Sequence, residues 1–215
     1  AAIEMADSLG LDIVSTSLGY TTFDDESFNF AYADMDGRSS RGAQAAIIAA
    51  RKGMLLIVAV GNDGNKAWHY LSTPADADSI LTVGAVDIDR TIANFSSFGP
   101  SADGRIKPEI CAVGKQTILL NPSNDEIMKG NGTSFACPLV AGMAACLWSA
   151  LPHASNMEIR ERIIRSSDRY STPHEQYGYG IPDAWQAYTS IYSEAKNIQI
   201  NSERACKQIM QFLSE

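Results

Sequence analysis

The sequence predicts an α/β protein built on a doubly wound, mostly parallel sheet with helices on both faces. First, residues 54–60 form an uninterrupted apolar run, which is typical of a central strand covered on both faces. Second, an Ala- and Ile-rich helix is expected at 41–52, between this run and an earlier strand at 12–18, and Gly53 is placed to end it. Strand, helix and strand in this order indicate a right-handed crossover. Third, small apolar residues dominate 134–150, which predicts a helix buried on nearly every side.

The remaining elements follow from the same patterns. The first residues place apolar side chains at helical spacing, so the sequence opens inside a helix. A polar insertion rich in Asp and Phe, residues 20–40, is expected to form a surface loop. Further strands are expected at 80–86, 110–113 and 117–120, all continuing the sheet, and an amphipathic helix at 156–165 precedes a Tyr- and Gly-rich turn at 177–180. A last amphipathic helix is expected at 202–213.

Composition narrows the class of protein. The 215 residues are 45% hydrophobic and 20% charged, which fits one globular domain. A net charge of -8 without a cluster of Lys or Arg argues against nucleic-acid binding. No run approaches the roughly 20 apolar residues of a membrane helix, so no membrane span is expected.

The four cysteines, Cys111, Cys137, Cys146 and Cys206, are too sparse to indicate a disulfide framework. Cys137 and Cys146 fall on one expected helix with their Cα atoms about 13 Å apart, beyond the roughly 7 Å that a disulfide allows. We therefore expect small buried thiols that act as packing residues. The cysteines do not indicate a cellular compartment.

A glycine-rich loop, residues 130–133, leads into the small-residue helix and ends at Ser134. Glycine lets the backbone turn sharply and approach a substrate closely. A serine at a helix start exposes its hydroxyl beside free backbone N–H groups that bind developing negative charge. A serine N-cap explains the same position, and this segment alone does not decide between the two roles.

A second polar loop, Gly61, Asn62, Asp63, Gly64 and Asn65, directly follows the fully apolar strand. Ligands of open α/β sheets bind at the carboxyl ends of strands. An Asn amide placed there donates to an oxyanion, a contact worth about 3 to 4 kcal/mol in the transition state. Read alone, this loop is better explained as an ordinary turn, since Gly and Asn dominate turns.

Taken together, these loops resemble the subtilisin-like serine protease family (subtilases, peptidase S8 type) over residues 7–188. The serine loop continues into Pro138 and the triplet Val140, Ala141, Gly142, as in that family. Six further segments match in the family's order: Ser17 to Gly19, Gly61 and Asn62, Thr82 to Val86, Phe95 to Gly99, Lys107 to Glu109, and Tyr179 to Pro182.

The resemblance implies a role for each matching residue. Residues 1–188 would be the C-terminal portion of a subtilisin-like catalytic domain, and 189–215 a C-terminal extension that is expected to be helical. Ser134 would be the nucleophile of a serine endopeptidase that works through an acyl-enzyme, with Asn62 and the Ser134 backbone N–H as oxyanion donors. The implied substrate-binding residues are Ser17, Leu18 and Gly19, which would pair with an extended peptide, together with Val60, Gly61, Thr73, Pro74 and Thr133.

The family's Asp and His segments precede the serine, and neither occurs in this sequence. His69, His153 and His174 lack the expected neighbourhood and are predicted to have surface or packing roles. Because these segments are missing, the fold is expected to be incomplete at its N-terminal side. A serine without a positioned base is a poor nucleophile, so the chain alone is expected to be inactive.

Two alternatives remain. Ser134, Asp168 and His174 follow the order used by α/β-hydrolases, but a nucleophile elbow must follow an apolar strand, and residues 128–131 are expected to form a polar loop. The second alternative is a non-catalytic remnant that binds a peptide or a partner through Ser17 to Gly19.

No cofactor is expected. Residues 34–37 resemble a calcium loop but lack its ladder of ligands, so a solvated loop is favoured and no metal site is predicted. The expected partners are a peptide or protein substrate and, because an incomplete sheet exposes apolar surface, the missing N-terminal part of the domain or a second copy of the chain. The family resemblance alone implies a secreted or cell-envelope location.

Overall fold

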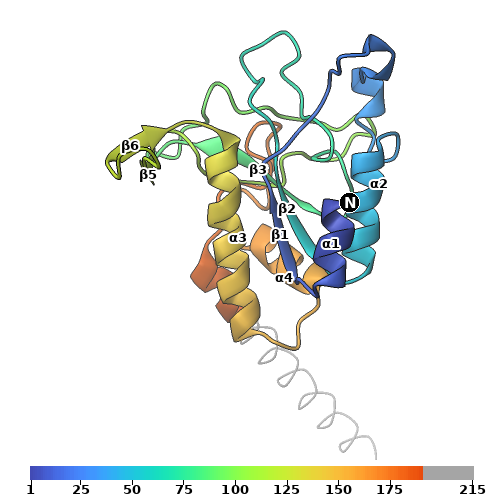
Figure 1. Cartoon of the computed structure of the whole chain (residues 1–215). Coiled ribbons are helices and arrows are strands. Elements are labelled where there is room, and N and C mark those ends of the chain that lie inside the picture. The colour runs from blue at the N-terminus through green and yellow to red at the C-terminus, as the bar shows by residue number, and fades with distance from the viewer. Residues whose placement is uncertain (191–215) are drawn as a thin grey trace, which may run out of the picture.

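The structure, a computed structural model, describes residues 1–190 and contains a four-stranded parallel sheet (Figure 1). Its strands are β1 (Ile13–Thr16), β2 (Leu55–Ala59), β3 (Leu81–Val86) and β4 (Ile110–Val113), and they are hydrogen-bonded in that order. The predicted parallel sheet is therefore confirmed, although β1 is shorter than residues 12–18.

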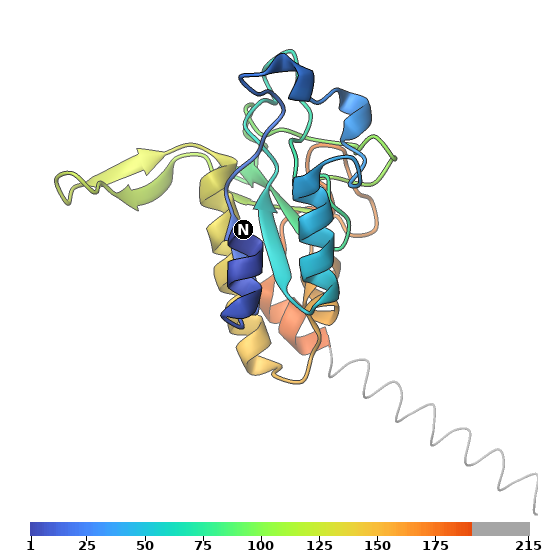
Figure 2. The ribbon, with the colours of Figure 1, turned by 45° about the vertical axis from the view of Figure 1, so that its right-hand side comes forward.

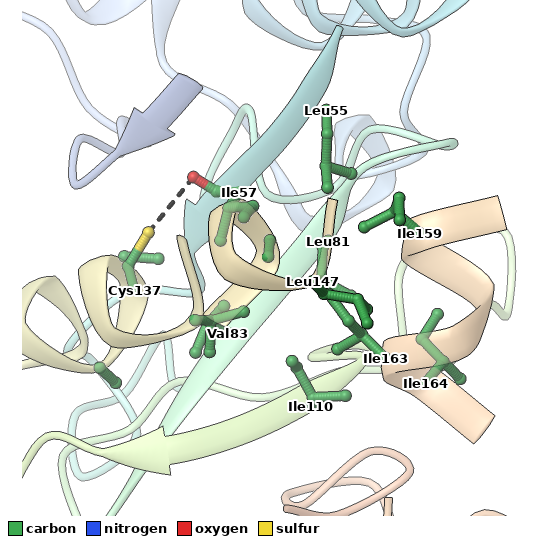
Figure 3. Close-up of a cluster of buried hydrophobic side chains, with 14 of the residues drawn as sticks. Leu55, Ile57, Leu81, Val83, Ile110, Cys137, Leu147, Ile159, Ile163 and Ile164 are labelled. Carbon is green, nitrogen blue, oxygen red and sulfur yellow. Dashed lines mark hydrogen bonds between the residues drawn. The ribbon is translucent and has the colours of Figure 1, made fainter. Parts of the chain in front are cut away.

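The central strand β2 is buried on both faces, as its apolar run predicts. Side chains alternate across a strand: Leu55, Ile57 and Ala59 belong to one hydrophobic cluster, and Leu56 and Val58 belong to the cluster on the opposite face. Figure 3 shows the first cluster, in which side chains of the strands meet those of two helices.

Helices cover both faces of the sheet. Two helices, α1 (Ala2–Ser8) and α2 (Arg41–Arg51), lie on one face, and α3 (Thr133–Ala150) and α4 (Asn156–Arg165) lie on the other (Figures 1 and 2). The Ser40 side chain caps α2 by accepting a hydrogen bond from the backbone N–H of Ala43. Gly53, with φ of 103°, follows that helix as predicted. Residues 184–190 are also helical.

The prediction that α3 is buried on nearly every side is wrong. One side of the helix packs across all four strands, but Pro138, Leu139, Gly142 and Cys146 on its outer side are exposed. Within the described residues, no element covers this outer side. Among these residues α3 alone has the length and apolar composition of a membrane-spanning helix, and its packing against the sheet makes it a core helix here.

The prediction for residues 117–120 is only half right. They form a strand, β5 (Thr117–Leu120), but β5 pairs antiparallel with β6 (Ile127–Gly130) in a separate two-stranded sheet. Gln116, with φ of 55°, turns the chain away from the main sheet after β4. The resulting hairpin projects from the body of the molecule (Figures 1 and 2). β6 also corrects the expectation of a polar loop at 128–131.

The insertion at residues 20–40 is mostly loop, with two short 3₁₀ helices, η1 (Glu26–Phe28) and η2 (Tyr32–Asp34). In the calcium-like segment, the carboxylates of Asp34 and Asp36 accept hydrogen bonds from nearby backbone N–H groups.

The free thiols of Cys111 and Cys137 are buried as predicted, but Cys146 is exposed on the outer side of α3. The helix expected at 202–213, Cys206 and nearly all of the proposed extension at 189–215 lie outside the described residues.

Candidate active site

The predicted site residues meet where the carboxyl ends of β1 and β2 face the start of α3. Ser17 directly follows β1, Asn62 lies shortly after β2, and Ser134 is the second residue of α3. The Ser17 hydroxyl donates a hydrogen bond to the backbone carbonyl of Ser134 at 3.2 Å. Parallel strands that end at one edge of the sheet thus bring together residues 117 positions apart.

Pro138 explains why the Ser134 carbonyl accepts this bond. In a regular α-helix the carbonyl of residue 134 would accept from the N–H of residue 138. Proline has no N–H, so the Ser134 carbonyl is left for another donor. Ser17 supplies that donor and ties the end of β1 to the turn that carries the predicted nucleophile.

The side-chain amide of Asn62 has a fixed orientation. Its Oδ1 accepts hydrogen bonds from the backbone N–H of Thr133 at 2.8 Å and from the Thr133 hydroxyl at 3.1 Å. Because a backbone N–H only donates, the atom that faces it must be the amide oxygen. The Asn62 Nδ2 group is therefore the end of the amide that is directed away from these two bonds. Thr133, predicted among the substrate-binding residues, donates both of these hydrogen bonds to Asn62.

The Asn62 loop is braced by Ser97, a buried residue whose role was not predicted. The Ser97 hydroxyl accepts from the N–H of Asp63 at 2.9 Å, and its backbone N–H donates to the Gly61 carbonyl at 3.1 Å. The same carbonyl accepts from the Thr133 hydroxyl at 3.2 Å. In the sequence, Ser97 was notable only as part of the segment Phe95 to Gly99 that resembles the family, and this resemblance does not show which residues Ser97 contacts.

The predicted peptide-binding edge, Ser17 to Gly19, is exposed. The Tyr20 N–H donates to the Thr73 carbonyl at 3.0 Å and ties this edge to the loop after β2, and the Ser72 N–H donates to the Val60 carbonyl at 3.3 Å and ties that loop to the end of β2.

Ser72 belongs to the loop at residues 71–75, which the family resemblance implies as a wall of the pocket, and its hydroxyl lies close to both Gly19 and Gly61. A Cβ atom added to Gly19 would lie 2.1 Å from the Ser72 hydroxyl, and one added to Gly61 would lie 2.9 Å from the Ser97 hydroxyl. Both glycines therefore allow a close approach that another residue would block. Of the other predicted wall residues, Val60 and Thr73 are buried and Pro74 is partly exposed.

Cys137 lies one helical turn after Ser134 but is directed into the core. Its thiol donates to the Ile57 carbonyl at 3.2 Å, as Figure 3 shows. Burial raises the pKa of the Cys137 thiol, so the thiol is protonated at neutral pH and is not a competing nucleophile.

None of the three histidines forms a hydrogen bond with Ser134 in the part of the chain that the structure describes. His69 stacks on Phe98 with ring centroids 5.2 Å apart. His153 lies beyond the far end of α3, which is about 27 Å long. The Nδ1 atom of His174 accepts from the N–H of Gln176 at 3.1 Å.

Within residues 1–190, no group of three or more His, Cys, Asp or Glu side chains is arranged to hold a metal ion.

The profile of the Subtilase family matches residues 1–180. The chain belongs to the subtilase family. Subtilisin DY from Bacillus licheniformis is 34% identical over 184 residues, which cover 84% of this chain and 58% of that protein. The minor extracellular protease Epr from Bacillus subtilis (strain 168) is 32% identical over 203 residues, covering 93% of this chain and 28% of Epr. This subtilase therefore spans less than two thirds of these relatives.

A solved structure gives the same result for the fold. The prenylagaramide maturation protease PagA superposes with a TM-score of 0.66 at 26% identity, covering 87% of this chain and 64% of PagA. Family membership overturns the α/β-hydrolase alternative. The geometry agrees: Asp168 Oδ1 accepts from the N–H of Ile181, and β6, which precedes the serine loop, belongs to the separate hairpin rather than to the main sheet.

Proposed function

We propose that this subtilase carries the nucleophile and the oxyanion donors of a serine endopeptidase. The observation that carries the proposal is the orientation of Asn62: its amide oxygen accepts two hydrogen bonds from Thr133, the residue that precedes Ser134, so Nδ2 is the end of the amide left to donate elsewhere. A donor fixed before the substrate arrives stabilises developing charge without reorganisation during the reaction.

The chemistry follows from this arrangement. The Ser134 Oγ attacks the peptide carbonyl carbon, and its proton passes to a base. The carbonyl oxygen, now negative, accepts from the Asn62 Nδ2 and from the Ser134 N–H at the start of α3, where free N–H groups favour negative charge. The C–N bond then breaks as the base returns the proton to the leaving amine, and water hydrolyses the resulting ester.

We propose that the base and its carboxylate partner come from polypeptide that precedes Ala1 in the complete protein. Two observations support this assignment. No histidine within residues 1–190 is bonded to Ser134, and β1 lies at an open edge of the described sheet. Apolar side chains are also exposed on the outer side of α3 (Leu139, 50%) and on the β5–β6 hairpin (Ile118, 62%; Ile127, 77%), as expected of surfaces that another segment covers.

Substrate class and location belong to the same proposal. The exposed edge at Ser17 to Gly19 suits an extended peptide that adds as a strand, so we propose peptide or protein substrates. Secretion or attachment to the cell envelope is supported by the extracellular location in the name of the relative Epr. The proposal includes no cofactor.

Hydrolysis of a fluorogenic casein tests the proposal with three proteins. These are the 215-residue chain, the same chain extended at its amino end through the missing Asp and His segments, and the extended protein with Ser134→Ala. We expect hydrolysis only by the extended protein with Ser134 intact. Equal hydrolysis by the Ser134→Ala form would overturn the proposal. An extended protein that folds and binds peptide but does not cleave it would support the non-catalytic remnant.

A further inference from the structure

We propose that Ser17 is a positioning residue for the reaction: its hydroxyl fixes the peptide unit that follows Ser134 and so holds the nucleophile in place for attack. This inference rests on the proposed function and adds a residue to it. The resemblance to the family implied only peptide binding for Ser17. The hydrogen bond from its Oγ to the Ser134 backbone carbonyl, at 3.2 Å, gives the side chain a different task.

The direction of the Ser17 side chain follows from the geometry of β1. Ser15 lies in this strand and Ser17 directly follows it, and side chains two residues apart in a strand share a face. The Ser15 hydroxyl lies 3.5 Å from the Cys137 thiol, and the Ser17 hydroxyl reaches Ser134, nearly one helical turn earlier. The end of β1 therefore runs opposite to the start of α3, and two contacts set its register against the helix.

The peptide unit between Ser134 and Phe135 is held at both ends. Its carbonyl oxygen accepts from Ser17, and its N–H donates to the Gly132 carbonyl at 3.1 Å. Because a peptide unit is planar, two bonds at opposite ends restrict rotation about the Cα–C bond of Ser134. The Cα atom that carries the nucleophilic side chain is thereby restrained, and a displacement of about 1 Å costs about 10²-fold in rate.

The loop after β2 holds the other side of the nucleophile. The N–H of Thr133, the residue before Ser134, donates to the Asn62 side chain at 2.8 Å. The strands β1 and β2 are hydrogen-bonded neighbours, and their carboxyl ends lie at the same edge of the sheet. Ser17 and Asn62 therefore hold Ser134 from two sides, each at the end of its own strand.

Pro138 makes the Ser17 hydroxyl necessary. A residue with an N–H at position 138 would donate to the Ser134 carbonyl within the helix. Proline has no N–H, and a carbonyl left without a donor away from water is costly. The two residues thus act as a pair, in which Pro138 removes the helical donor and Ser17 replaces it with a donor from the end of β1.

The side chain and the backbone of Ser17 have separate tasks. A peptide that adds as a strand pairs with backbone N–H and C=O groups, and Ser17→Ala keeps these groups. Loss of the hydroxyl should therefore lower kcat and leave KM nearly unchanged. A side chain that only bound the peptide would instead change KM with kcat unchanged.

The test measures kcat and KM of the extended protein and its variants with a fluorogenic peptide. We expect Ser17→Ala to lower kcat about tenfold and Ser17→Thr, which keeps a hydroxyl, to restore most of it. Ser15→Ala is the matched control, because it removes a hydroxyl from the same face of β1 whose partner is Cys137, and it should leave kcat unchanged. Urea denaturation establishes that each variant is folded under the assay conditions.

Pro138→Ala tests the cause of the effect. It restores an N–H that donates to the Ser134 carbonyl, so adding Ser17→Ala to this background should lower kcat by less than about twofold. Three results would overturn the inference: an equal fall in both backgrounds, an unchanged kcat in Ser17→Ala alone, or a change confined to KM. All three leave the proposed function intact, whereas a folded extended protein that cleaves no peptide would contradict the proposed function and this inference together.

Discussion

At the scale of single residues, the decisive feature is that Thr133 orients Asn62. One backbone N–H and one hydroxyl, at 2.8 and 3.1 Å, determine which end of the amide faces the predicted oxyanion position. Thr133 should therefore act through Asn62 without touching the substrate.

Substitutions in the extended, active protein test this relation. Asn62→Ala is expected to lower kcat by about 10²- to 10³-fold with little change in KM, since the lost contact forms mainly in the transition state. Thr133→Val keeps the backbone N–H and loses the hydroxyl, so we expect a smaller fall in kcat, and Thr133→Ser should restore most of it. If Thr133→Val lowered kcat as much in an Asn62→Ala background as alone, Thr133 would not act through Asn62.

The sequence predicted part of this site. Ser134 and Asn62 were identifiable because their two loops, taken together, resemble the motifs of the subtilase family, whereas an N-cap or a turn explains each loop alone. The contacts of Ser72 and Ser97 were not identifiable, because they depend on which distant backbone each serine approaches, and a buried serine leaves no periodic signal. The bond from Ser17 to Ser134 depends on the backbone carbonyl that Pro138 leaves without a helical donor. Predicting this bond requires the register of the helix as well as the presence of the proline.

At the scale of elements, α3 is half core helix and half surface. Its inner side contacts every strand of the main sheet, and its outer side exposes Leu139 and Cys146. A row of small apolar residues indicates that a helix packs closely, but it does not show on how many sides other elements cover the helix. The prediction of burial on nearly every side therefore overestimated the burial of α3.

Thiol alkylation tests this two-sided character. Iodoacetamide should modify the exposed Cys146 in the folded 215-residue chain and leave Cys111 and Cys137 unmodified until denaturant is added. Burial raises the pKa of the Cys111 thiol to about 12, so almost no reactive thiolate exists there at neutral pH. Peptide mapping by mass spectrometry identifies the modified residue. In the extended protein, protection of Cys146 would show that upstream polypeptide covers α3, and unchanged reactivity would contradict the proposed covering.

At the scale of the whole molecule, a buried ion cluster joins the sheet to α4 and to the loop after β2. The Glu109 carboxylate lies 2.8 Å from Lys107 and 2.9 Å from Arg160, and it also accepts from the Thr82 N–H at 2.7 Å. The Lys107 ammonium donates to the Ala77 carbonyl at 2.8 Å. Glu109 and Lys107 are almost wholly buried.

Glu109→Gln should therefore be strongly destabilising, because it leaves two cations in the core without a counter-charge. We expect a loss of about 3 to 5 kcal/mol in the free energy of unfolding, measured by urea denaturation. Glu161→Gln is the matched control, since that residue forms an exposed pair with Arg165 and should change stability by less than about 1 kcal/mol. Similar losses for the two variants would contradict the role of the cluster.

The same cluster predicts a pH dependence. Burial alone would raise the pKa of Glu109, but the charges of Lys107 and Arg160 outweigh it and hold the pKa below its ordinary value of 4.5. A carboxylate whose pKa is lower in the folded state stabilises the protein above the unfolded pKa and loses that contribution as pH falls through the folded pKa. Urea midpoints should thus fall as pH drops below about 4.5, and this fall should be smaller in Glu109→Gln.

The overall architecture was predictable because runs that are apolar on both faces specify a covered parallel sheet. The separate β5–β6 hairpin was not, since Thr117 to Leu120 has the composition of a sheet strand and only the backbone turn at Gln116 directs it elsewhere. The hairpin exposes Ile118 and Ile127, and β1 leaves one edge of the described sheet open.

The central claim, that Ser134 is the activated nucleophile, is tested most directly by reaction with a fluorophosphonate followed by peptide mapping. In the extended protein we predict a single phosphonyl adduct on Ser134, formed rapidly at neutral pH, and none in the 215-residue chain under the same conditions. An adduct on another serine, or none on a folded extended protein, would contradict the account.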